Sequence, residues 1–112
     1  MEARRVAKLV QVALDTLRAQ ELAHHTDPVT HPHGYLGSMH LRDLVLQDEH
    51  SAKTRRRIWE KVEHIVEGNA NVRASMEELK GEETRAWQWT GSTNNISPRR
   101  VQWTASAKEE SD

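Results

Sequence analysis

Residues 51–91 constrain the fold most, because a helical pattern there gives way to a strand pattern. Apolar residues at positions 58, 59, 62, 65 and 66 recur at the three- and four-residue spacing of an amphipathic helix. Gly68-Asn69 predicts the end of that helix, since both residue types tolerate a left-handed conformation. From Val72 onward, apolar and polar side chains alternate with the period of a strand. A helix followed directly by a strand is therefore predicted.

The residues after this strand predict a β-hairpin packed on a helix. Lys80-Gly81-Glu82 supplies a turn, and Trp87 and Trp89 on the returning strand fall on the same face. A lone hairpin is marginal in water, so this indole face must lie against a helix, and Trp59 is the expected partner. Leu9, Ala13 or Leu17 of the first helix should complete the contact. The expected structural core includes Trp59, Val62, Val72, Trp87 and Trp89.

The first half of the chain predicts two more helices. Apolar residues recur at helical spacing over residues 2–25, and Pro28 stops that pattern by removing a backbone donor. The following loop has room for a strand of one or two residues at Tyr35-Leu36. Ser38 is the expected N-cap of a short second helix, and Asp48 or Ser51 should cap the third. The expected buried residues of the second helix are Leu41, Leu44 and Val45.

Three helices, a short strand and a terminal hairpin predict a winged helix of the α+β class over residues 1–91. The whole chain of 112 residues is expected to form one domain, monomeric in isolation. Residues 92–112 are too polar to bury a core and are expected to be a disordered tail, although Val101 or Trp103 could dock on the domain. Within this tail, Ser97 precedes Pro98-Arg99-Arg100 and is a candidate site for a proline-directed kinase.

Composition excludes several function classes. The net charge of −1 and the pI near 6.7 give no bulk attraction to nucleic acid, so only a local patch could bind it. The absence of cysteine excludes disulfides, thiolate zinc sites and a cysteine nucleophile. No apolar run approaches the ~20 residues of a membrane span, and no signal peptide is visible. An excised domain of a membrane protein would also lack its anchors.

An enzymatic function is not expected. The chain has no glycine-rich phosphate loop, no serine nucleophile elbow and no pair of carboxylates framed by apolar sequence. We therefore predict no catalytic residue, no cofactor and no small-molecule substrate. His24, His25, His31 and His33 could in principle ligate zinc, but their spacing matches no closed-site pattern, so no metal site is predicted.

The start of the third helix carries the sharpest electrostatic signal. Cations at a helix N-terminus and acids at its C-terminus oppose the helix dipole by a few tenths of a kcal/mol each. The cations are Lys53, Arg55, Arg56 and Arg57, and the acids are Glu60, Glu63 and Glu67. The functional interpretation is a surface for an acidic partner, with Lys80 and Arg85 on the wing as further contacts. The alternative is a solvated face on which Arg55 or Arg56 pairs locally with Glu60, which sits at helical spacing from Arg56.

Three segments resemble a known family: Trp59-Glu60-Lys61-Val62, Glu67-Gly68-Asn69-Ala70-Asn71-Val72-Arg73, and Gly81-Glu82-Glu83-Thr84-Arg85-Ala86-Trp87-Gln88-Trp89. They are similar to the C-terminal nucleoplasmic domain of LEM-domain inner-nuclear-membrane proteins (the Man/Src type), in its fungal version. The shared features are the helix-three Trp, the Asn-x-x-Val-Arg exit into the first wing strand and the Gly-Glu…Trp-x-Trp ending. The similarity continues upstream through Leu41-Arg42-Asp43-Leu44 and covers roughly residues 3–91.

This resemblance implies a location and a partner. It implies a winged helix that follows two membrane spans and faces the nucleoplasm at the inner nuclear membrane. Its partner in the family is the ESCRT-II/ESCRT-III hybrid adaptor, which it recruits and activates to seal and survey the nuclear envelope. DNA or chromatin contact is the implied alternative. The LEM motif, the spans and the luminal region lie outside this chain, and the shared residues are mainly structural.

Two function classes therefore remain, and charge separates them. A nucleic-acid reader would place the third helix in the major groove and the wing on phosphate. Acids at Glu60, Glu63 and Glu67 along that helix would repel a duplex, and the near-zero net charge gives little pull. Protein binding is thus expected ahead of DNA binding.

Overall fold

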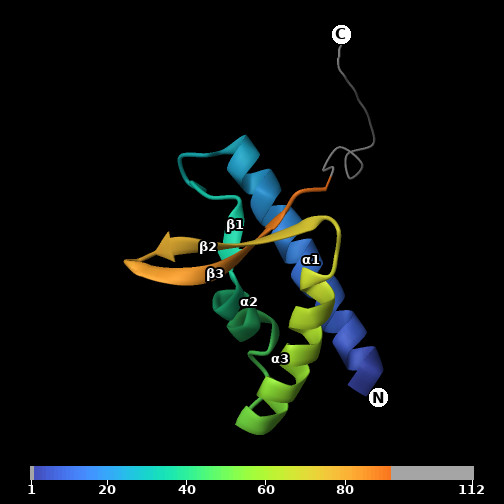
Figure 1. Ribbon diagram of the computed structural model, residues 1–112. Coiled ribbons are helices and arrows are strands. Elements are labelled where there is room, and N and C mark those ends of the chain that lie inside the picture. Colours follow the sequence, from blue (N-terminus) through green and yellow to red (C-terminus); the bar gives the residue numbers. More distant parts are fainter. Residues whose placement is uncertain (1, 92–112) are drawn as a thin grey trace.

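The computed structural model describes residues 2–91 of the chain. These residues form a winged helix of the α+β class, as the sequence predicts (Figure 1). The elements are α1 (Glu2–Thr26), β1 (Tyr35–Gly37), α2 (Ser38–Val45), α3 (Ala52–Glu67), β2 (Val72–Leu79) and β3 (Glu82–Trp89). The predicted tail, with Ser97, Val101 and Trp103, lies outside the described residues, so its disorder stays a prediction.

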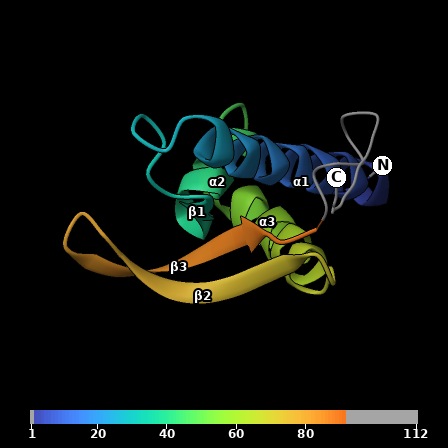
Figure 2. The ribbon, with the colours of Figure 1, turned by 90° about the horizontal axis from the view of Figure 1, so that it is seen from above.

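The sheet is antiparallel, with the strand order β1-β3-β2. Trp87 on the central strand is the register partner of both Leu36 on β1 and Ala74 on β2. The short strand expected near Tyr35-Leu36 is therefore confirmed, and it extends to Gly37. Seen from above, α1 and α3 lie on one side of the hairpin, and the hairpin tip projects away from them (Figure 2).

The core is centred on stacked indoles, as predicted. The rings of Trp59 and Trp87 stack with centroids 5.6 Å apart, and the Trp87 side chain is fully buried. Trp89 is also buried and has the Arg18 guanidinium 5.1 Å from its ring centroid. Burying three such side chains accounts for much of the hydrophobic stabilisation of a small domain. The same cluster contains Val6, Val10, Ala13, Leu14, Leu17, Leu41, Leu46, Ile58, Val62 and Val66, with Leu9 and Val72 packed against it.

Two apolar residues expected in the core are exposed. Leu44 is 43% exposed, because the short helix α2 contributes Leu41 to the core and Leu46 follows it there from the next turn. Ile65 is 47% exposed, although it belongs to the apolar stripe of α3. The facing part of α1 offers only the small side chains of Ala3 and Ala7, which do not cover it.

The helix termini confirm both predicted ends of α3 and correct the predicted cap of α2. Ser51 caps α3, because its Oγ accepts a hydrogen bond from the Thr54 amide across 3.2 Å. The N-cap of α2 is Gly37, and Ser38 is instead the first helical residue, with its hydroxyl buried and unpaired among the described residues. α3 ends at Gly68, as predicted, but the left-handed conformation expected there is wrong: the φ of Gly68 is −81°, and its amide donates back to His64 and Val66.

The left-handed conformation lies instead at the hairpin tip. Lys80 has φ 54° and Gly81 has φ 82°, and the flanking residues Leu79 and Glu82 are register partners. This is a two-residue turn with positive φ at both positions, whose twist matches that of the flanking strands. The turn fixes the register that places Trp87 and Trp89 on the helix side.

Within residues 2–91, no helix has the length and apolar character needed to cross a bilayer.

Candidate interaction surface

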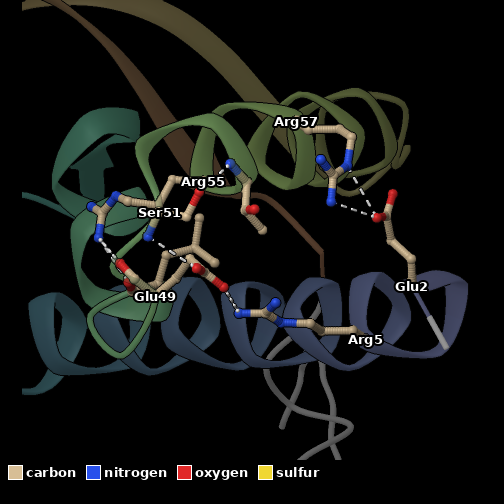
Figure 3. A network of polar contacts seen from close by, with 8 residues as sticks. Glu2, Arg5, Glu49, Ser51, Arg55 and Arg57 are labelled. Carbon is tan, nitrogen blue, oxygen red and sulfur yellow. Dashed lines mark hydrogen bonds and ion pairs between the residues drawn. The ribbon is translucent and has the colours of Figure 1, made fainter.

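Arg55 forms hydrogen bonds with the loop that connects α2 and α3. Its Nη1 donates to the backbone oxygens of Leu46 and Glu49 across 2.8 and 3.2 Å, and its Nη2 donates to Asp43 across 2.9 Å. These bonds satisfy the Glu49 carbonyl in the connecting loop and give the Leu46 carbonyl, which also accepts from the Glu49 amide, a second donor. Figure 3 shows this side chain turned toward the connecting loop, next to Glu49 and Ser51. Its guanidinium is therefore engaged within the domain.

Glu2 connects the first turn of α1 to α3 through ion pairs. Its carboxylate accepts from Nε and Nη2 of Arg57 across 3.1 and 3.0 Å (Figure 3). The same carboxylate also pairs with Lys61. Hydrogen bonds from Lys61 and then Arg57 hold the pKa of the Glu2 carboxyl below its ordinary value. A second contact nearby joins Arg5 to Glu49 across 2.9 Å. Glu2 of α1 thus partly neutralises the cations of α3, including Arg57, which opposes the helix dipole.

The remaining cations of the predicted surface are exposed. Lys53, Arg56 and Lys80 lie in solvent and form no ion pair within residues 2–91. The pairing of Arg55 or Arg56 with Glu60, the alternative interpretation of the sequence, is not formed in this part of the chain. The structure does not bring the six candidate cations into one patch, because Lys80 is at the hairpin tip and Lys53 is in the first turn of α3. Their role in partner binding stays a prediction.

Arg85 is engaged by Glu67, a contact that the sequence analysis missed. Its Nη2 donates to Glu67 Oε1 across 3.0 Å, and its Nε donates to Oε2. The buried indole Nε1 of Trp87 donates to the same Oε2 across 2.7 Å. The Arg85 hydrogen bond and, more weakly, the Trp87 bond hold the pKa of Glu67 below its ordinary value, although burial opposes them. The signal available from sequence was that a buried Trp needs an acceptor.

Carboxylates dominate the wing around Lys80. Glu78 and Glu83 are direct register partners across the hairpin, and both are exposed. They share the sheet face that also carries Trp87 and Trp89, which is the side toward α3. Like charges directly opposite each other on a hairpin are destabilising. Since nothing in residues 2–91 forms an ion pair with either one, this side of the wing is acidic around Lys80.

An apolar groove lies between α1 and α3. It has a volume of about 500 Å³, and we call it the α1–α3 groove. Ala3, Val6 and Ala7 form one side, and Ile65 forms the other with the outer residues of its helix. The full lining is Ala3, Val6, Ala7, Glu60, Lys61, His64 and Ile65.

The histidines make local contacts. His24 Nδ1 lies 2.7 Å from the His31 carbonyl oxygen, and His25 Nε2 lies 2.9 Å from Glu21. His33 stacks on Tyr35 with ring centroids 4.7 Å apart. Within the described range 2–91, no three side chains of the metal-ligating types gather closely enough to hold a metal ion.

Comparison with known proteins gives two matches. The family model of the Man1-Src1p-C-terminal domain matches residues 1–92. The "Inner nuclear membrane protein SRC1" of Saccharomyces cerevisiae is 30% identical over 88 residues, which cover 78% of this chain and 10% of that protein. The chain therefore spans about a tenth of the length of this curated relative. No solved structure matches the chain significantly. Because the family model covers most of its length, the chain belongs to the Man1-Src1p C-terminal domain family.

Proposed function

We propose that this domain is the nucleoplasmic interaction module of an inner-nuclear-membrane protein of the LEM family. In this role it recruits and activates the ESCRT-II/ESCRT-III hybrid adaptor, which seals and surveys the nuclear envelope. Membership of the Man1-Src1p C-terminal domain family supports the location, as does the similarity to a yeast inner nuclear membrane protein. The domain acts by binding, with no catalytic step.

The acidic wing is the observation that favours a protein partner over DNA. A winged helix that reads DNA sets its third helix in the major groove and its wing on phosphate. Here Glu78 and Glu83 stand opposite each other beside Lys80, and Arg85 is held by Glu67. Carboxylates at these positions repel the phosphate backbone, which supplies most of the non-specific affinity for DNA.

DNA or chromatin binding is the second candidate function. The exposed cations Lys53 and Arg56 at the start of α3 favour it, because neither is paired within residues 2–91. Together with Lys80 they would contact only a few phosphates. A contact of that size predicts weak binding that disappears at physiological salt.

Two titrations of the 112-residue protein test the proposal. The first uses the purified adaptor. We expect a Kd that is micromolar or lower, which corresponds to a binding free energy of about −8 kcal/mol or more negative. The second uses a labelled DNA duplex over a salt series, and we expect weak binding. The triple variant Lys53→Gln/Arg56→Gln/Lys80→Gln should lose this residual DNA binding. Tight DNA binding with a steep salt slope, together with no adaptor binding, would reverse the assignment.

A further inference from the structure

The α1–α3 groove has an apolar floor that the domain itself leaves uncovered. Ile65 is 47% exposed, whereas Ile58, Val62 and Val66 of the same helix are fully buried. The facing residues of α1 are Ala3 and Ala7, whose small side chains leave the volume of about 500 Å³ open. A groove of this size accepts one or two aliphatic side chains of a partner helix. Single exposed apolar residues are common on protein surfaces, but Ile65 lines an apolar groove.

Ion pairs cross one end of this groove. The ion pairs of Glu2 with Arg57 and Lys61 fix the first turn of α1 against α3, next to Ala3. The groove is present in the domain without a partner, so little conformational entropy is lost in shaping it on binding.

The two edges of the groove differ in their charges. Arg4 and Lys8 directly follow Ala3 and Ala7, so the 3.6-residue repeat places them on the outer edge along α1. Both are exposed, and neither forms an ion pair within residues 2–91. On the α3 edge, Glu60 is exposed and also unpaired in that range. The edge along α1 is thus basic, whereas the edge along α3 carries the unpaired acid Glu60 and also Lys61, whose charge is paired with Glu2.

We infer that the α1–α3 groove is the docking site for an amphipathic helix of the protein partner proposed above. The apolar stripe of that helix packs on Ile65, Ala3 and Ala7. Its acidic flank lies along Arg4 and Lys8, and a basic residue on its other flank meets Glu60. This inference rests on the proposed function and names the surface that performs it. It differs from the sequence prediction, which placed the partner at the start of α3.

Substitutions in the floor of the groove test the inference in the adaptor titration. Ile65→Glu places a charge in the floor, and Ala7→Gln fills it without adding charge. Each should weaken adaptor binding by roughly tenfold or more, as expected for the loss of a central anchor. Met76→Glu is the matched control, because Met76 is 54% exposed on the wing and lies outside the groove. It should bind like the parent, and all three variants should keep the parent melting temperature.

Charge reversals test the orientation of the docked helix. Arg4→Glu/Lys8→Glu should weaken adaptor binding, and so should Glu60→Lys. The double variant Arg73→Glu/Lys80→Glu carries the same change in net charge on the wing and should bind like the parent. At high salt, the loss of binding caused by the charge reversals should shrink because salt screens charges. The loss caused by Ala7→Gln should persist, because its effect is steric.

The outcomes separate the inference from the proposed function. If the parent binds and the Ile65 and Ala7 variants bind equally well, the groove is not the interface, while the proposed function stands. If the parent does not bind the adaptor, both fail. If the parent protein is a dimer in solution and Ile65→Glu is a monomer, a second copy occupies the groove and the inference is overturned.

Discussion

The indole Nε1 of Trp87 donates a hydrogen bond to Oε2 of Glu67 across 2.7 Å, which joins the last residue of α3 to the central strand of the sheet. The same carboxylate accepts two bonds from Arg85. Glu67 therefore fixes the helix and the root of the wing in one arrangement. An acid at a helix C-terminus is unfavourable by itself, and these three bonds compensate for it.

Removing this carboxylate should destabilise the domain. Glu67→Ala leaves the buried Trp87 N–H without an acceptor, which costs about 1–3 kcal/mol of unfolding free energy. Glu60→Ala, at an exposed and unpaired acid of the same helix, should change stability by less than ~0.5 kcal/mol. Urea unfolding followed by Trp fluorescence measures both. Equal effects of the two substitutions would show that the Glu67 bonds contribute nothing.

Stability should fall in acid through the same group. The pKa of Glu67 is held below its ordinary value of 4.5, first by the Arg85 hydrogen bond. A carboxyl with a depressed pKa in the folded state stabilises that state above its unfolded pKa, and the contribution is lost as the pH falls through the folded pKa. The pKa values of Glu2 and Glu49 are lowered in the same direction. We therefore expect constant stability near neutrality and a decline below about pH 4.5.

Glu67→Gln isolates this contribution. The stability difference between parent and variant should be largest near neutral pH and should shrink as the pH drops toward 3. Unfolding free energies measured at several pH values give this difference directly, with Glu60→Gln as the control for lost charge. A difference that stays constant over the whole range would exclude Glu67 as a source of the acid sensitivity.

Periodicity was sufficient to predict the fold. The stripe that contains Trp59, together with the alternation that places Trp87 and Trp89 on one face, determines which surfaces must meet. Capping chemistry at Ser51 was equally local, since the hydroxyl and the amide are three residues apart. Ser38 was mispredicted because Gly37 already had the extended conformation of an N-cap, and the strand before it fixed the start of the helix.

The polar contacts could not be predicted in the same way. Periodicity indicates which face a residue occupies, but not which residue lies opposite. Glu2 and Arg57 are 55 residues apart, and their pairing depends on how α1 crosses α3. Ile65 illustrates the same limit for apolar residues. It continues the stripe of its helix, yet it is exposed because the facing side chains on α1 are alanines.

Two buried tryptophans should respond differently to the same substitution. The Nε1 of Trp59 is buried without a hydrogen-bond partner in residues 2–91, whereas that of Trp87 is bonded to Glu67. Trp87→Phe loses this bond and leaves the carboxylate with one partner fewer. It should therefore cost about 1–2 kcal/mol more unfolding free energy than Trp59→Phe. Chemical unfolding followed by circular dichroism compares them; a greater loss at Trp59 would indicate that ring packing outweighs the hydrogen bond.

Adjacent arginines at the start of α3 provide the last test. Both oppose the helix dipole, and by that argument alone neutralising either one would leave stability unchanged or slightly higher. The structure changes that expectation for Arg55, which bonds two backbone oxygens and Asp43. Arg55→Gln should lower the unfolding free energy by about 1–2 kcal/mol, since charge-assisted bonds to carbonyl groups are lost.

Arg56→Gln is its matched control, one residue along the helix. Arg56 is exposed and forms no ion pair within residues 2–91, so only the dipole term changes. Removing its charge should leave stability equal to the parent or a few tenths of a kcal/mol higher. Thermal and urea unfolding of the two variants decide the matter. If both are destabilised alike, the dipole argument fails at Arg56; if neither is, the bonds of Arg55 do not stabilise the turn between α2 and α3.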